Sequence, residues 1–255
     1  MIQIVLTPSA GKRLIGKAVA QHPSIKAALK SGILTIVAGT TNGYVAEEIL
    51  GSIGQADGFS KESFFRGVTM PLSMSVNQKE NSAGDKAFPG DVVIVNGKWQ
   101  RGRTIYDVVD EMKEGDVILK GANALDLYNR TAAVLIGNPE GGTIIASLRA
   151  AVGKRVRLII PVGLEKRVFC PLNELALKIN APGSTGLRLL PVYGEIITEI
   201  QAISILSGAC AEIFAAGGIC GAEGAVWIAV SGNCEQEQKM KEIADAIAKE
   251  PRFCI

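Results

Sequence analysis

The residues best suited to chemistry form a glycine-rich turn between an apolar run and a helical pattern. The turn consists of Gly39, Thr40, Thr41, Asn42 and Gly43. The β-branched run 33–37 before it predicts a buried strand, and the apolar spacing in 44–50 predicts a helix. Small residues let backbone N–H groups approach an anion, which the free N–H groups of a helix start favour. We predict that these five residues bind an anionic ligand; the alternative is a connection rich in glycine for steric reasons.

A second glycine-bearing turn follows the predicted strand 116–120. Lys120 ends that strand and Gly121 begins the turn. Ligands bind at the carboxyl ends of parallel strands, so Lys120 is a candidate catalytic or anion-contacting residue and Gly121 a ligand-binding one. Asn123 is a further ligand-binding candidate and Asp126 a catalytic one, through contacts with ligand hydroxyl groups. The alternatives are a solvated lysine at a strand end and two side chains that cap a turn.

The composition favours helices packed closely on a sheet. Of 255 residues, 47% are hydrophobic and only 5% aromatic, so Ala, Val, Ile and Leu must build the core. Predicted strands alternate with predicted helices from the N-terminus to about residue 162. We therefore predict an α/β fold, a three-layer α/β/α arrangement with a mainly parallel, Rossmann-like sheet and a small C-terminal α+β lobe.

The predicted organisation has two parts. Residues 1–178 form the α/β/α core domain, with a β-rich insertion around 66–103 that contains a polar loop at 77–86. The loop 179–186 is the boundary, and residues 187–255 form the lobe. Within the lobe, 195–216 is predicted to be one long helix, followed by a strand at 225–230 and a helix at 235–249.

Charge and hydropathy exclude two classes of partner. The formal charge is +2, from 27 basic and 25 acidic residues that are dispersed, so no nucleic-acid partner is predicted. The apolar stretch 196–216 is adjoined or interrupted by Glu195, Glu199 and Glu212, so no membrane partner is predicted either. The first residues lack the order of a secretory signal, and we expect a soluble, cytoplasmic protein.

Cysteine and histidine spacing argues against a metal or a cofactor. The chain has five cysteines and one histidine, His22, with no closely spaced cysteine pair. We predict no metal site and no cofactor, and we expect small buried thiols. A redox protein that uses these cysteines is an alternative. A single histidine also removes most Ser–His and Cys–His nucleophile arrangements.

Four segments, in order, resemble one superfamily. They are AGTTNG at 38–43, LKGANALD at 119–126, EGGTIIASL at 140–148 and RLIIPVG at 157–163. Together they are similar to the phosphate loop and following motifs of ribose-5-phosphate isomerase, glucosamine-6-phosphate deaminase, sugar-responsive regulators and coenzyme A transferases. The resemblance implies a ligand at the carboxyl ends of the strands, with Gly141 and Gly142 among the ligand-binding residues.

The catalytic positions depart from the isomerase pattern. Isomerisation of a sugar phosphate needs a carboxylate base and a polarising group near the carbonyl oxygen. The resemblance places the four isomerase residues at or near Lys120, Asn123, Pro139 and Leu148, none of which has the required type. Ordinary ribose-5-phosphate isomerase activity is therefore not expected. A coenzyme A transferase would need a glutamate nucleophile, for which Glu140 is the candidate; the alternative is an acid at a helix start.

Two functions follow from the sequence. The first is a protein that binds a phosphorylated or anionic small metabolite, as an isomerase-like or transferase-like enzyme. The second is a non-catalytic metabolite-sensing or assembly subunit of the same superfamily, which the missing acid–base residues favour. The apolar segment 196–216 suggests contact with a partner chain, and we expect a homo-oligomer.

Overall fold

The computed structural model describes residues 1–66, 69 and 90–254. The predicted loop 77–86 lies outside these residues, as does much of the predicted insertion 66–103. The helices are α1 (Pro8–Gln21), α2 (Pro23–Lys30), α3 (Thr40–Ser52), α5 (Ile105–Val108), α6 (Gly142–Lys154), α7 (Leu172–Ile179), α8 (Glu199–Ser207) and α9 (Cys234–Ile247). The strands are β1 (Ile2–Leu6), β2 (Ile33–Ile36), β3 (Val92–Val95), β4 (Lys98–Trp99), β5 (Val117–Leu119), β6 (Ala124–Asp126), β7 (Thr131–Ile136), β8 (Arg157–Pro161), β9 (Arg188–Val192), β10 (Glu195–Ile197), β11 (Cys210–Ala216) and β12 (Val226–Ser231).

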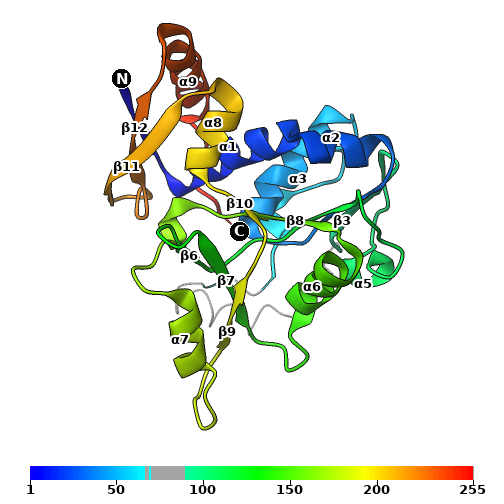
Figure 1. Ribbon diagram of the computed structural model, residues 1–255. Coiled ribbons are helices and arrows are strands. Elements are labelled where there is room, and N and C mark those ends of the chain that lie inside the picture. Colours follow the sequence, from blue (N-terminus) through cyan, green and yellow to red (C-terminus); the bar gives the residue numbers. More distant parts are fainter. Residues whose placement is uncertain (67–68, 70–89, 255) are drawn as a thin grey trace.

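The central sheet is mixed, with the strand order β10-β8-β5-β2-β3-β4. β10, β8, β5 and β2 pair in parallel, whereas β3 and β4 run antiparallel to their neighbours. Asn96 and Gly97 join β3 to β4 with φ angles of 48° and 76°, the hairpin geometry that an Asn-Gly pair favours. Figure 1 shows α1, α2 and α3 above this sheet and α5 and α6 below it.

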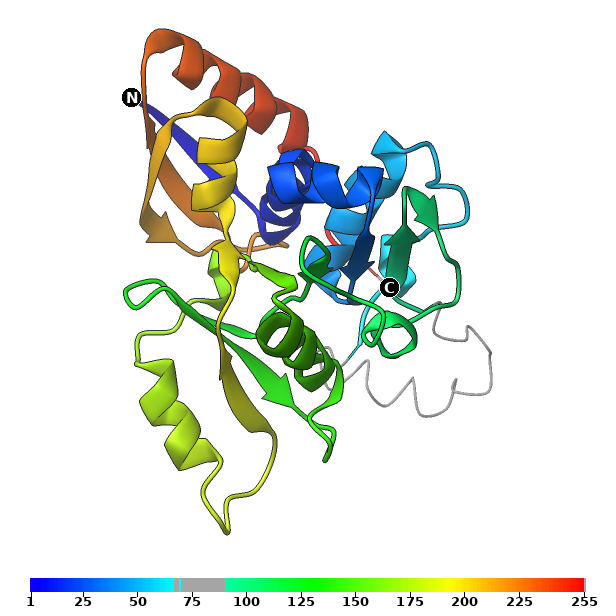
Figure 2. The same ribbon diagram turned by 45° about the vertical axis from the view of Figure 1, so that its right-hand side comes forward.

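Two further sheets are wholly antiparallel. One has the order β1-β12-β11 and the other β6-β7-β9. They lie beside the central sheet, the first with α8 and α9 and the second with α7 (Figures 1 and 2). The predicted fold class was therefore wrong: the protein is mixed α/β with antiparallel sheets and one mixed sheet, not a mainly parallel, Rossmann-like three-layer fold.

The error arose where apolar runs turn back on themselves instead of crossing over. The alternation of predicted strands and helices up to about residue 162 indicated parallel pairing. Within that range, residues 131–136 form β7, which pairs antiparallel with β6 and with β9. The predicted helix 195–216 was also wrong, because this stretch contains β10, α8 and β11. Gly208, with φ of 76°, ends α8, and the residues after it adopt an extended strand.

Strand pairing joins distant parts of the chain. β1 pairs with β12 along its whole length, from Ile2 opposite Val230 to Leu6 opposite Val226. β10 is added to the central sheet through β8. The division between 1–178 and 187–255 stays a prediction, and three strand pairings cross it: β1 with β12, β8 with β10 and β7 with β9.

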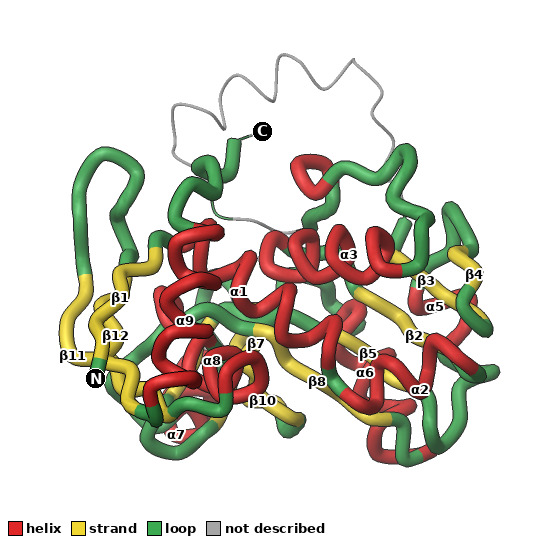
Figure 3. The backbone as a smooth tube through the Cα atoms, turned by 90° about the horizontal axis from the view of Figure 1, so that it is seen from above, coloured by secondary structure: helices red, strands yellow, loops and turns green. Residues whose placement is uncertain are grey.

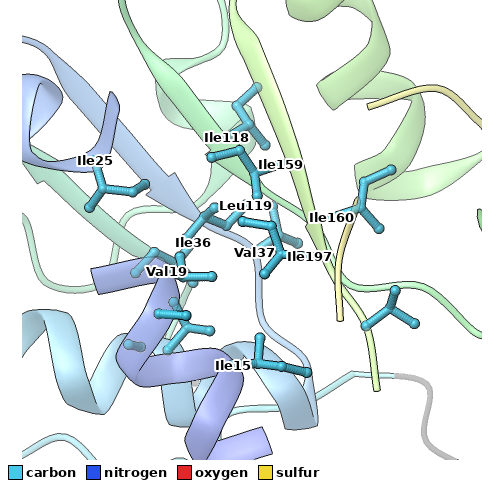
Figure 4. Packing of buried hydrophobic residues seen from close by; sticks show 14 of the residues in the cluster. Ile15, Val19, Ile25, Ile36, Val37, Ile118, Leu119, Ile159, Ile160 and Ile197 are labelled. Atoms are coloured by element: carbon cyan, nitrogen blue, oxygen red, sulfur yellow. The ribbon is translucent and has the colours of Figure 1, made fainter. Parts of the chain in front are cut away.

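Aliphatic side chains fill the space between the sheet and its helices. Ile36, Leu119 and Ile159 come from neighbouring strands and lie against Ile15 and Val19 of α1 (Figure 4). All five are buried. In the view from above, α1 and α3 lie side by side over the strands (Figure 3). This packing fixes the height of α3 over the sheet, and with it the position of the turn that precedes the helix.

A buried carboxylate joins the amino ends of β2 and β5. Asp116, immediately before β5, accepts hydrogen bonds from the backbone N–H groups of Ile33 at 2.7 Å and Lys113 at 2.8 Å. The Asp116 side chain and its bond to Ile33 are buried, so the Ile33 N–H group would be left without a partner if the carboxylate were removed, whereas the bond to Lys113 is only partly buried. Asp116 therefore sets the relative position of two adjacent parallel strands.

We expect Asp116→Ala to lower the free energy of unfolding by roughly 2–4 kcal/mol, because two N–H groups, one of them in a buried bond, lose their acceptors. The matched control is Asp110→Ala. Asp110 pairs with Arg149, and both side chains are more than half exposed, so this change should cost less than about 1 kcal/mol. Chemical denaturation of both variants measures the difference, and equal losses would contradict this role of Asp116.

Candidate functional site

The two glycine-bearing turns that follow β2 and β5 open into one cleft. The cleft has a volume of about 650 Å³. Its lining includes Gly39, Thr40, Thr41, Asn42, Lys120, Gly121, Asn123, Gly141 and Gly142, all of which the sequence singled out. The turns meet because β2 and β5 are adjacent and parallel, so their carboxyl ends lie at one edge of the sheet.

Asn42 fastens the two strand ends together. Its Nδ2 donates to the backbone carbonyls of Val37 at 2.7 Å and Leu119 at 3.1 Å. The N–H group of Val37 donates to the same Leu119 carbonyl at 2.9 Å. The side chain is completely buried, and its Oδ1 has no hydrogen-bond partner among the described residues. Asn42 thus supports the cleft with its nitrogen and presents an acceptor with its oxygen.

The first turn of α3 points N–H groups into the cleft. Thr40, Thr41 and Asn42 are its first three residues, and their N–H groups have no acceptor in the part of the chain that the structure describes. Gly39 precedes them in extended conformation, and a Cβ built on it would meet nothing within 4 Å. Thr41 is 2% exposed, yet its Oγ1 also has no partner there. Unpaired buried donors of this kind need a ligand or solvent.

A second helix begins at the same cleft. Gly141 and Gly142, with φ angles of 82° and 66°, lead into α6 in a conformation that favours glycine. Thr143 and Ile144 complete the first turn, and all four residues line the cleft. No side chain of the described residues caps this helix, so its first N–H groups are available at the cleft, and two helix starts face one space.

Three cationic side chains line the cleft: Lys120, Lys166 and Arg66. Burial, together with the nearby positive charge of Lys166, lowers the pKa of Lys120 to about 8. Burial also lowers the pKa of Lys166, whose Nζ donates to the Ala122 carbonyl at 2.7 Å. Arg66 pairs with Asp91 at 3.2 Å. Among the described residues, no Asp or Glu lines the cleft, so its electrostatic character is that of an anion site.

Three residues that the sequence proposed for the site lie outside the cleft lining. Gly43 faces the turn at 61–63, where its Cβ would stand 3.1 Å from that of Lys61. Asp126 accepts hydrogen bonds from the backbone N–H groups of Tyr128 and Asn129, and from Nδ2 of Asn129 at 2.7 Å. These bonds lower its pKa against the effect of burial and cap the β6–β7 turn. Glu140 is exposed beside the cleft. Their predicted roles remain untested.

Sequence reasoning missed six polar residues among the described residues of the lining. They are Arg66, Thr69, Tyr106, Asn138, Thr143 and Lys166. Lys166 could have been predicted in the same way as Lys120, from its position at the carboxyl end of a parallel strand. It lies just beyond β8, the next parallel strand of the sheet. The others offered no such signal. Arg66 and Tyr106 are held beside the site by Asp91, which pairs with Arg66 and accepts from the N–H groups of Ala38 and Ile105.

The cysteines differ from expectation. Cys170 is partly buried, but Cys210, Cys220, Cys234 and Cys254 are exposed, so the expected burial of the thiols was wrong. None of the five lines the cleft.

Within the described ranges, no group of three or more His, Cys, Asp or Glu side chains is placed to hold a metal ion. In the same ranges, no helix has the length and apolar character needed to cross a membrane.

Behind the cleft lies a buried group of opposite charges. Glu199, the first residue of α8, is buried and accepts from the Leu164 N–H at 2.9 Å through Oε2. Lys12 pairs with Glu165 at 3.0 Å. Burial, and then the charge of Glu165, raises the pKa of Glu199 to about 8, while Lys12 opposes the rise. Burial therefore favours the protonated form of the Glu199 carboxyl.

No protein-family model matches the chain, and no curated protein matches it either.

The raised pKa of Glu199 predicts a stability that depends on pH. The folded state holds this proton up to about pH 8, whereas the unfolded chain releases it near pH 4.5. The stabilisation that this proton gives the folded state is complete below pH 4.5 and is lost as the pH rises through 8. We expect the free energy of unfolding to fall by roughly 1–3 kcal/mol between these values, and Glu199→Gln to remove most of this fall. The exposed Glu174→Gln is the control, and equal pH slopes in all three proteins would contradict the prediction.

Proposed function

We propose that the protein binds a phosphorylated small metabolite in the cleft at the carboxyl ends of β2 and β5. The observation that carries the proposal is the meeting in one cleft of two helix starts, those of α3 and α6, that no described side chain caps. Each start offers several backbone N–H groups and the positive end of a helix dipole. The buried and unpartnered Oγ1 of Thr41 adds a side-chain group that needs a partner.

The charges around the cleft favour an anion over a cation or a neutral ligand. Lys120 and Lys166 are half-buried, with no carboxylate paired to either in the described part of the chain. An anionic ligand in the cleft would offset the positive charge of these two side chains, so the cleft as a whole should favour a phosphorylated ligand.

The remainder of the lining suits a carbon skeleton with polar substituents. Val134, Ile136 and Ile144 form an apolar part of the lining, and Tyr106 stands half exposed at the cleft. The amide groups of Asn123 and Asn138 add polar contacts, since each accepts a backbone N–H through Oδ1, and neither Nδ2 has an acceptor among the described residues. A small phosphorylated metabolite, rather than inorganic phosphate alone, matches this division into a charged part and an apolar part.

The second candidate is a non-catalytic sensor of such a metabolite. The absence of carboxylates from the described lining favours it, because proton transfer between adjacent carbons calls for a carboxylate base. A sensor returns its ligand unchanged. Prolonged incubation with ribose 5-phosphate, followed by recovery of the sugar phosphate, distinguishes the two candidates: turnover excludes the sensor.

A pair of glycine variants on one helix tests the binding site. In Gly39→Ala, the new Cβ stands in open space beside the first N–H groups of α3, where it should displace a phosphate without clashing with the protein. We expect thermal stability close to that of the wild type and an affinity for inorganic phosphate lower by about tenfold, equal to about 1.4 kcal/mol. Isothermal titration and thermal unfolding in the presence of phosphate give the two measurements.

The matched control is Gly51→Ala. Gly51 lies near the other end of α3, its Cβ would also meet nothing within 4 Å, and it does not line the cleft. This variant should gain up to about 1 kcal/mol of stability from helix propensity and bind phosphate like the wild type. Absence of any phosphate-dependent stabilisation in the wild type, or equal affinity in both variants, would refute the proposed site.

A further inference from the structure

Lys120 has the weakest polar contacts among the three cationic side chains of the cleft lining. Within the described residues it forms no ion pair, and its Nζ has a single acceptor, the Gly121 carbonyl, at the long distance of 3.5 Å. Lys166, by contrast, donates to the Ala122 carbonyl at 2.7 Å. The charges nearest to Lys120 are those of Lys166, Arg66 and Asp91, and the carboxylate among them is already paired with Arg66. The amine of Lys120 therefore faces the cleft without an anionic neighbour of its own.

The surroundings also favour the neutral amine. Burial and the positive charges of Lys166 and Arg66 both disfavour a third ammonium, while Asp91 opposes them only in part. With a pKa of about 8, roughly a quarter of the Lys120 side chains carry a neutral amine at pH 7.5, against about one in a thousand for an ordinary lysine. A desolvated lysine next to other cations is an activated nucleophile toward carbonyl carbon.

We propose that Lys120 is the nucleophile that forms an imine with the carbonyl carbon of a phosphorylated aldehyde or ketone bound in the cleft. This inference rests on the proposed function, because the helix starts of α3 and α6 must hold the phosphate. It goes further because it assigns the carbonyl end of the ligand to Lys120. Imine formation would allow covalent chemistry even though the described lining contains no carboxylate.

The step balances with the groups present. The neutral Lys120 amine adds to the carbonyl carbon, the C–O double bond opens, and the amine proton passes to the oxygen to give a carbinolamine. The Lys166 ammonium protonates the hydroxyl, which leaves as water, and the nitrogen lone pair forms the C–N double bond of a protonated imine. Return of the N–H proton to the neutral Lys166 amine gives the imine and restores Lys166. The products are the imine and one water molecule, and no oxidant or reductant takes part.

The test is reductive trapping with dihydroxyacetone phosphate. Sodium borohydride reduces an imine to a stable secondary amine, which intact-mass measurement counts and peptide mapping locates. We expect one adduct for each chain, on Lys120, formed at least about tenfold faster than on any other lysine, including Lys166. The rate should rise as the pH increases through 8, inorganic phosphate should suppress it, and dihydroxyacetone without phosphate should label poorly.

Two variants and one binding measurement separate the outcomes. Lys120→Arg should lose the adduct and keep its affinity for phosphate, and Lys98→Arg, which replaces an exposed lysine on β4, should behave like the wild type. Mapping of the wild-type adduct needs no variant, so the proposal stays testable if Lys120→Arg fails to fold. Phosphate binding without an adduct on Lys120 overturns the imine and leaves the proposed function standing. Failure of the wild-type protein to bind phosphate overturns the proposed function.

Discussion

The site depends on one buried amide. Asn42 bridges the carbonyls of Val37 and Leu119, and so holds the carboxyl ends of β2 and β5 at a fixed separation. Because Asn42 is also the third residue of α3, the same side chain sets where the helix starts relative to both strands. A hydrophobic residue there would leave the Val37 carbonyl without a donor among the described residues and the Leu119 carbonyl with only the Val37 N–H group. The same side chain therefore satisfies buried polar groups and sets the geometry of the site.

The cleft concentrates positive potential without the carboxylates that usually accompany it. The described lining carries lysine and arginine side chains together with two helix starts, whereas the acidic groups lie behind it, on Glu165, Glu199 and Asp91. Those acids are tied to Lys12, Arg66 and backbone N–H groups. The acids therefore stabilise the walls of the cleft while leaving its interior electropositive.

Local patterns predicted the position of most elements and the two turns, but not how the strands pair. The glycine turn at 39–43 and the Lys120 turn each come directly after an apolar run. Their positions at the ends of two strands could therefore be predicted from the sequence, and those strands are neighbours in the sheet. β7 and β9 are more than fifty residues apart, and the pattern of apolar residues in each run does not indicate that they pair antiparallel with each other. Lys166 was within reach of the same strand-end rule, whereas Arg66 depends on its contact with Asp91, which no local pattern reveals.

The pairing of β1 with β12 has a consequence for how the chain folds during synthesis. The hydrogen-bonding partner of β1 is β12, which is distant from it in the sequence. Until residues 226–231 have been made, the edge of β1 that pairs with β12 stays unmatched, although α1 can already pack against α3. Closure of this sheet must therefore order a large loop, and the nascent protein carries an exposed strand edge until it closes.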